Sequence, residues 1–253
     1  MKERAPTQTA IRCLAAIAGL AAASYASYVT ITWLRFGRVA PSTGDEVGSL
    51  LDRFMPTYEV EERHQTHVAA PNDVTFAAAS EMDIQRVPVV RALFKGRALF
   101  LGGKGNEAER PRTLLAWMQS LGWTVLAHVP GRQVVLGTVM RPWEPDPSPR
   151  VVTPEEFAAF CEPAYVKIVS TWAAQPIGPH ESWFTIATRV ATTDPAARRL
   201  FRRYWSLFSP GSLLIRYVGL RLVRGEAERH AQAETSSSSG GTSPELGEQG
   251  SRR

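Results

Sequence analysis

The feature that most constrains this chain is a run without a charged side chain near the N-terminus, covering residues 13–34. As an α-helix, these 22 residues would be about 33 Å long, close to the roughly 30 Å hydrocarbon core of a bilayer. Tyr28 and Trp33 stand near the end of the run and Arg35 follows it, and membrane interfaces select such aromatic and basic residues. We therefore predict a single-pass membrane protein whose residues 1–38 form an N-terminal transmembrane anchor.

Two other interpretations of this run are open. One is a cleaved signal peptide, because Ala22, Ser24 and Ala26 offer small side chains to a signal peptidase. The run is, however, longer than the ~7–15 residues of a signal-peptide apolar core. The other is a buried core helix, although the run has no polar face to turn toward water.

The side of the membrane on which the rest of the chain lies is also open. Three basic residues precede the apolar run and two follow it closely, which favours an N-terminus on the inside and a main domain outside. The two cysteines, Cys13 and Cys161, do not suggest a disulfide, and this favours the opposite orientation because exported domains often carry disulfides.

The rest of the chain divides into a linker over residues 39–56, one domain over residues 57–225, and a polar, serine-rich tail over residues 226–253. We expect the tail to be disordered, because it has too few apolar residues to bury a core. The whole chain is 44% hydrophobic and 21% charged, which is a globular composition. Its net charge of +5 is too small to indicate nucleic-acid binding, so no nucleic acid is expected among the partners.

Hydrophobic periodicity predicts an α+β domain. Strands are predicted over residues 58–68, 123–129, 133–140, 165–173 and 183–192, with residues 175–178 as the turn between the last two. Helices are predicted from residue 72, over residues 87–100 and 114–121, and from Thr153 with a capping box. A further helix is predicted from residue 196, with a kink or break at Pro210 and a second helical stretch over residues 212–224. A sheet with turn-linked strands and a long final helix favours packing of that helix across the sheet.

Short motifs follow one another across residues 50–225: Arg63-His64, Val68-x-Ala70-Pro71, Pro88-x-Val90-Arg91-x-Leu93, Gly137-x-x-x-x-Pro142-Trp143, Phe157-x-x-Phe160-x-Glu162-Pro163-x-Tyr165-x-Lys167, Thr188-Arg189-Val190 and Thr193-Asp194-x-Ala196-Ala197-Arg198-x-x-Phe201-x-x-Tyr204-Trp205. In this order they resemble a bacterial branch of the START-like, polyketide cyclase/dehydrase and lipid-transport superfamily (SRPBCC). The resemblance implies a helix-grip fold, in which a curved antiparallel sheet wraps around a long C-terminal helix and encloses an apolar pocket. It implies no single reaction, because this fold hosts carriers, receptors and cyclases. Relatives often carry an acidic residue where this chain has Ala187, which argues against catalysis here.

Glu62 and His64 are the candidate catalytic residues. They share one face of the first predicted strand, about 6.6 Å apart along it at ~3.3 Å per residue. A histidine paired with a carboxylate in a pocket can act as a general base. The alternative is that both are polar residues on an outer face. His67 falls on the opposite face of the same strand and cannot join them.

Four residues are candidates for binding a ligand: Arg189, His64, Trp172 and Lys167. A basic residue in the middle of a strand suits a ligand carboxylate or phosphate. A structural ion pair or a solvated face explains Arg189 and Lys167 equally well, and plain core packing explains Trp172.

Four arginines within six residues, Arg198, Arg199, Arg202 and Arg203, lie beside aromatic residues in the long helix. In a chain with a membrane anchor, they are predicted to face anionic lipid. The alternative is a solvated helix face. The sequence contains no phosphate-binding glycine loop, no Gly-x-Ser-x-Gly elbow and no Cys-x-x-Cys or His-Glu-x-x-His pair, so neither a cofactor nor a metal is expected.

These observations lead to one main functional hypothesis: a membrane-anchored START-like domain that binds a hydrophobic small molecule or lipid in an internal cavity, as a carrier or sensor. The first alternative is a cyclase- or dehydrase-like enzyme that uses Glu62 and His64 in the same cavity. The second is a structural or partner-binding membrane protein without an open cavity.

Overall fold

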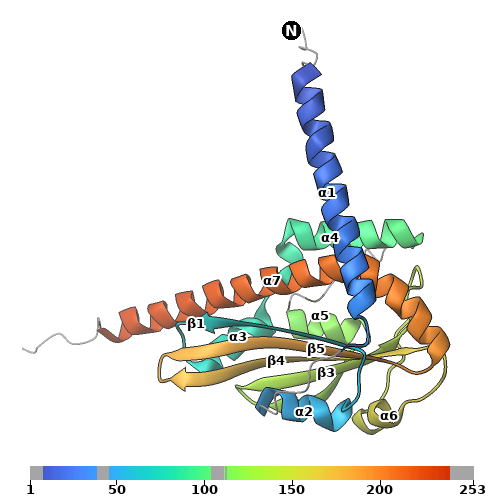
Figure 1. Ribbon diagram of the computed structural model, residues 1–253. Coiled ribbons are helices and arrows are strands. Elements are labelled where there is room, and N and C mark those ends of the chain that lie inside the picture. Colours follow the sequence, from blue (N-terminus) through green and yellow to red (C-terminus); the bar gives the residue numbers. More distant parts are fainter. Residues whose placement is uncertain (1–7, 39–45, 104–110, 112, 240–253) are drawn as a thin grey trace, which may run out of the picture.

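The computed structural model describes residues 8–38, 46–103, 111 and 113–239. Its centre is a five-stranded antiparallel sheet in the order β1-β5-β4-β3-β2, so that β1 and β2 are the edge strands (Figure 1). The strands are β1 (Val60–Val68), β2 (Thr124–Val129), β3 (Gln133–Met140), β4 (Val166–Gly178) and β5 (Glu181–Thr192). With the long final helix, this confirms the predicted α+β class.

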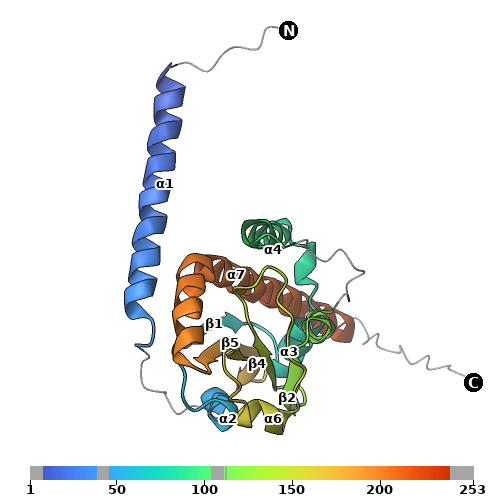
Figure 2. The same cartoon turned by 90° about the vertical axis from the view of Figure 1, so that its right-hand side faces the viewer.

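One face of the sheet, here called the inner face, is covered by α3 (Asn72–Glu81), α5 (Leu114–Ser120) and α7 (Pro195–Ser239). A short 3-10 turn (Ile84–Arg86) leads into α4 (Pro88–Leu101), which lies outside α7 (Figures 1 and 2). The core on this side includes Val134, Leu136, Trp172, Phe184 and Val223, all buried. Alternate residues of β3 face the inner side, and this explains why Val134 and Leu136 belong to this core.

The other face, here called the outer face, is covered by α2 (Glu46–Phe54) and α6 (Pro154–Ala159) (Figure 1). The predicted capping box of α6 is confirmed, because Thr153 and Glu156 each accept a hydrogen bond from the other's backbone N–H. Helix α2 corrects the predicted linker over residues 39–56. Its apolar side chains recur at helical spacing and pack under the sheet, with Leu51 only 1% exposed. Residues 39–45 lie outside the described residues.

Helix α1 (Gln8–Arg35) projects away from this body, and nearly all of its side chains are exposed (Figure 1). The interpretation as a buried core helix is therefore wrong. The helix is long and apolar enough to cross a membrane, a property that a signal sequence shares. Its last three turns contact α7: the Tyr25 hydroxyl donates to the Leu207 carbonyl (2.7 Å), and the Arg202 guanidinium donates to the Trp33 carbonyl (2.6 Å).

Helix α7 is longer than predicted. It continues through Pro210 and runs on to Ser239. Figure 1 shows a bend in the first part of α7. Residues 226–239 are therefore helical rather than a disordered tail, because Ala227 packs fully buried in the inner core. Residues 240–253 lie outside the described residues.

The segment predicted as a turn at residues 175–178 instead extends β4.

Candidate functional site

The register of the sheet separates the predicted polar residues into two groups. In the pairing of β1 with β5, Glu62 lies opposite Thr188 and Glu61 lies opposite Arg189. Because successive side chains in a strand point to opposite faces, Glu62 and His64 lie on the inner face. Arg189 lies on the outer face and cannot join them.

The predicted Glu62–His64 pair forms. His64 Nε2 lies 3.1 Å from Glu62 Oε2, and the two side chains are 27% and 28% exposed. Beside them on the inner face, the hydroxyls of Ser170 and Thr188 are buried and hydrogen-bonded to each other at 2.9 Å. Because β1 is an edge strand, this polar row is partly open to solvent at its Glu62–His64 end.

Arg216 of α7 brings a third charged group to this region. Its Nη1 is shielded from solvent and has no hydrogen-bond partner among the described residues. Loss of solvation lowers the pKa of Arg216, while electrostatic interactions with Glu62 and then Tyr28 oppose that change. A shielded donor without a partner costs free energy, so this Nη1 is an unsatisfied donor among the described residues.

The sequence analysis missed Arg216. Its signal is a lone base in the otherwise apolar segment over residues 213–220 of the long helix. A base in such a segment either reaches water along its alkyl stem or stays buried. Only the packing of α7 on the sheet shows that its Nη1 is buried.

Trp172 is the other predicted residue on the inner face. It lies opposite Ile186, which in turn lies opposite His64, so the three residues form one row across the sheet. Two strand spacings separate Trp172 from His64, about 9.6 Å. Trp172 is 5% exposed and belongs to the inner core. Its predicted role in binding is untested.

Arg189 is the centre of an ion-pair cluster on the outer face. Its guanidinium donates to Asp52 of α2 (2.6 Å), Glu61 of β1 (2.9 Å) and the Met55 carbonyl (3.3 Å), and it lies over the Tyr58 ring. The side chain is 1% exposed. These contacts describe a residue that joins α2 to the sheet, and its predicted role in ligand binding is untested.

Lys167 also lies on the outer face. Its ammonium donates to the Ala158 carbonyl of α6 (3.0 Å) and lies over the Phe157 ring. Loss of solvation lowers the pKa of Lys167. Its contacts hold α6 against the sheet, and its predicted role in ligand binding is untested.

The predicted membrane-surface arginines lie where α7 meets the end of α1. Arg202 stacks on the Trp33 ring at 4.1 Å, and Arg198 pairs with Glu59 at 3.6 Å. Arg199 and Arg203 are exposed. A surface hollow of about 320 Å³ lies here, lined by Phe36, Pro195, Arg198, Arg199 and Arg202. Contact of this group with lipid stays a prediction.

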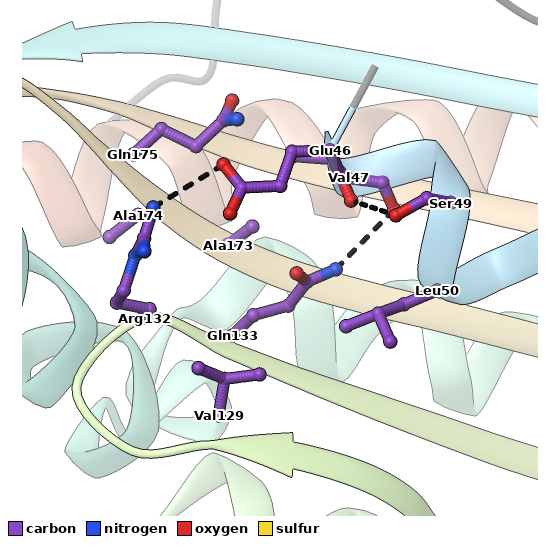
Figure 3. Close-up of a pocket in the computed structure, with 10 residues that line it drawn as sticks. All are labelled: Glu46, Val47, Ser49, Leu50, Val129, Arg132, Gln133, Ala173, Ala174 and Gln175. Carbon is purple, nitrogen blue, oxygen red and sulfur yellow. Dashed lines mark hydrogen bonds and ion pairs between the residues drawn. The ribbon is translucent and has the colours of Figure 1, made fainter. Parts of the chain in front are cut away.

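A second surface hollow, of about 270 Å³, lies between the start of α2 and the residues of β3 and β4 near the β2–β3 turn (Figure 3). Its polar residues bind one another: Arg132 pairs with Glu46 at 3.3 Å, and Gln133 donates to the Val47 carbonyl at 3.4 Å. This hollow therefore fixes the start of α2 on the sheet. Neither hollow is lined by Glu62, His64 or Arg216.

In the part of the chain that the structure describes, no group of three His, Cys, Asp or Glu residues is placed to hold a metal ion.

Comparison with known proteins gives limited matches. No family model matches the chain, and no curated protein matches it. Among solved structures, the chain is similar to the Zhui aromatase/cyclase from Streptomyces sp. R1128, with 14% identity and a TM-score of 0.25 over 69% of this chain and 97% of that one. It is also similar to a protein from Thermus thermophilus (11% identity, TM-score 0.24, 70% and 99% of the two chains). A hypothetical protein from Helicobacter pylori matches with 6% identity and a TM-score of 0.33 over 76% and 99%. At these TM-scores the likenesses carry no weight for function.

Proposed function

We propose that the protein binds an apolar small molecule or lipid between β1 and α7, as a carrier or sensor, and that Arg216 binds a hydrogen-bond-accepting oxygen of this ligand. The observation that carries the proposal is the Arg216 guanidinium, whose buried Nη1 has no partner among the described residues. A carbonyl or carboxylate oxygen satisfies such a donor, and a charge-assisted bond of this kind is short and strong.

The neighbouring residues suit the rest of such a ligand. Glu62 and His64 offer hydrogen-bonding groups at the open edge of the site, and the buried apolar residues of the inner core lie beyond them. A few polar groups that orient a ligand among apolar side chains are the usual composition of a binding site.

The position of the site suits a ligand that comes from a membrane. Tyr28 of α1 interacts electrostatically with Arg216, and the Tyr28 hydroxyl lies 3.3 Å from that of Ser209 in α7. The site thus lies where α1, α7 and β1 meet. If α1 crosses a bilayer, an apolar molecule reaches this junction without crossing much water.

The test compares two substitutions on the same helix. Full-length protein is purified in detergent, its bound molecules are identified by native mass spectrometry and solvent extraction, and its affinity for cis-parinaric acid is titrated by fluorescence. Arg216→Met is expected to weaken this binding at least about tenfold, since a hydrogen bond to a charged group contributes roughly 1.5–3 kcal/mol. Arg221→Met, at an exposed position of α7, is expected to bind like the natural chain.

Stability separates loss of the ligand from loss of the fold. Replacing Arg216 with an apolar side chain of similar length removes a shielded donor that makes no hydrogen bond among the described residues, and this is expected to be neutral or stabilising. Arg216→Met is therefore expected to melt no lower than the natural chain while binding less. A natural chain that carries and takes up no apolar molecule would contradict the proposal and favour the structural or partner-binding alternative.

A cyclase- or dehydrase-like activity is the second candidate, and the 3.1 Å contact between Glu62 and His64 supports it. A rate with a polyketide-like substrate that follows a bell-shaped pH profile and disappears in both Glu62→Gln and His64→Gln would favour the enzyme. Binding that survives these substitutions, with no turnover in the natural chain, would favour the carrier.

A further inference from the structure

Helix α4 exposes a continuous apolar face. Val89, Ala92, Gly96, Leu99 and Phe100 recur at a spacing of three, four, three and one residues, so they share one side of the helix. All five are exposed, and Leu99 and Phe100 reach 84% and 70%. On the opposite side only Val90 is fully buried. A helix on the surface of a water-soluble protein normally turns its apolar side toward the core. Helix α4 instead leaves this apolar side exposed.

Basic residues flank this face. Arg91 and Lys95 are exposed along one border of it, and Arg97 is tied to the body by a hydrogen bond to the Pro142 carbonyl (2.7 Å). Residues 84–103 contain no Asp or Glu. An apolar helix face bordered by bases matches the boundary of an anionic bilayer, where acyl chains meet negatively charged headgroups.

Helix α4 lies on the side of the body from which α1 rises. Both views show α4 above α7, with the sheet, α2 and α6 farther from the projecting part of α1 (Figures 1 and 2). The contacts agree: Tyr25 of α1 bonds to the Leu207 carbonyl, and the next residue, Phe208, contacts Phe100 of α4 with ring centroids 5.5 Å apart. The junction of α1 with the body is thus adjacent to the apolar face of α4.

The length of α1 places the bilayer at this junction. The uncharged residues that precede the bond of Tyr25 to α7, residues 13–24, are 12 residues and about 18 Å long. This is less than the roughly 30 Å of a hydrocarbon core. If α1 crosses the membrane, the boundary of the bilayer must therefore lie past Tyr25, beside α4.

We propose that α4 is a second membrane-binding element, which lies flat in the headgroup–acyl boundary of the same anionic bilayer that α1 crosses. The inference depends on the membrane anchor, and it goes beyond ligand binding because it fixes the whole domain against the lipid. With a perpendicular anchor and a flat helix, the domain has one orientation toward the membrane rather than swinging from a tether. The ligand site proposed at Arg216 then stays beside the lipid.

The test measures the depth of single positions in the full chain, reconstituted in vesicles of phosphatidylcholine and phosphatidylglycerol. In a background with Cys13→Ala and Cys161→Ala, spin labels are attached to Leu99→Cys, Val151→Cys or Leu20→Cys. Val151 is the matched control for Leu99, because the two side chains are 83% and 84% exposed. Val151 lies just before α6, on the far side of the body. The readout is the ratio of collisions with oxygen to collisions with a water-soluble nickel complex.

The label at position 99 is expected to give a ratio about fivefold or more above that at position 151, as for a site some 5–10 Å below the headgroups. Adding Arg91→Gln and Lys95→Gln is expected to reduce that ratio. A lipid-like ratio at position 20 with equal, water-like ratios at positions 99 and 151 would overturn the role of α4 and leave the anchor intact. A water-like ratio at position 20 would overturn both. If the ratio at position 99 is the same with and without the Arg91→Gln and Lys95→Gln substitutions, the role of anionic lipid is overturned.

Discussion

At the scale of single residues, the face of the sheet determines what a polar side chain can do. Arg189 and Glu62 lie on neighbouring strands, offset by one residue in register, and face opposite sides. On the outer side, Arg189 donates from its Nε and Nη1 to two carboxylates and a carbonyl. On the inner side, Arg216 interacts electrostatically with Glu62, but its shielded Nη1 has no partner among the described residues. The two guanidinium groups thus differ in whether a shielded donor is left without a hydrogen bond.

Substitution of Arg189 is expected to destabilise the domain. Arg189→Met leaves Asp52 and Glu61 without their cation. We expect the free energy of unfolding to fall by about 3 kcal/mol, because removal of the buried partner leaves the carboxylates without a compensating charge. Thermal melting of the full chain in detergent, followed by circular dichroism, measures the change. Parinaric acid binding at a temperature where the variant is folded is expected to be unchanged.

The control for this prediction is Arg132→Met. Arg132 also joins α2 to the sheet through an ion pair, but its side chain is 43% exposed and that of Glu46 is 66% exposed. Exposed pairs contribute only about 0–1 kcal/mol. Equal melting of the two variants would show that burial of Arg189 does not determine its effect, and lost ligand binding in Arg189→Met alone would assign it a role in the site.

At the scale of elements, local signals placed the start of a helix more reliably than its end. The capping box at Thr153 and the prolines at the starts of α6 and α7 agree with the structure. The end of α7 does not agree, because the helix continues through Pro210 to Ser239. Proline removes one backbone hydrogen bond from a helix, and the contacts of α7 with α1 and with the sheet offset that loss.

The cap of α6 is expected to contribute measurably to stability, because α6 covers the outer core. Thr153→Ala removes the side-chain oxygen that accepts from Glu156 N–H, and we expect a loss of about 1 kcal/mol. That corresponds to roughly 2–4 °C in melting temperature for a domain of this size. Thr153→Ser keeps the oxygen and is expected to melt like the natural chain; if it melts like Thr153→Ala, the cap is not the cause.

At the scale of the whole molecule, the fold has two ends of different character. The end with α2 and α6 has its ion pairs and caps satisfied within the described residues, while the end with α1 and α4 exposes large apolar side chains. Exposed contiguous apolar surface of this kind marks a site that contacts lipid or protein. The contacts between α1 and α7 join the projecting helix to this second end.

This arrangement predicts that α1 is retained in the mature protein. Cleavage within residues 22–26 would remove most of the apolar run but leave Tyr28 and Trp33 bonded to the body. We expect the protein to stay in the membrane fraction after alkaline carbonate extraction and to have an intact mass near 27.9 kDa. A soluble product that lacks the first two dozen residues or so would establish the signal-peptide alternative instead.

What the sequence determined by itself is local. An uncharged run of 22 residues predicts α1, alternation predicts the strands, and Thr153 with Glu156 predicts a cap, because each of these depends on neighbours within a few residues. The pairing of Glu62 with His64 belongs here too, since two residues of one strand face need no other element to meet.

Contacts between side chains of distant segments depend on the tertiary structure and cannot be inferred from local pattern. The ion pairs of Arg189 need α2, which was expected to be a linker, and the unpartnered Nη1 of Arg216 depends on how α7 crosses the sheet. The exposed apolar side of α4 is equally invisible in the sequence, because an apolar stripe has the same spacing whether it faces a core or a bilayer. Burial is a property of the assembled fold, and for this reason it could not be inferred from local pattern.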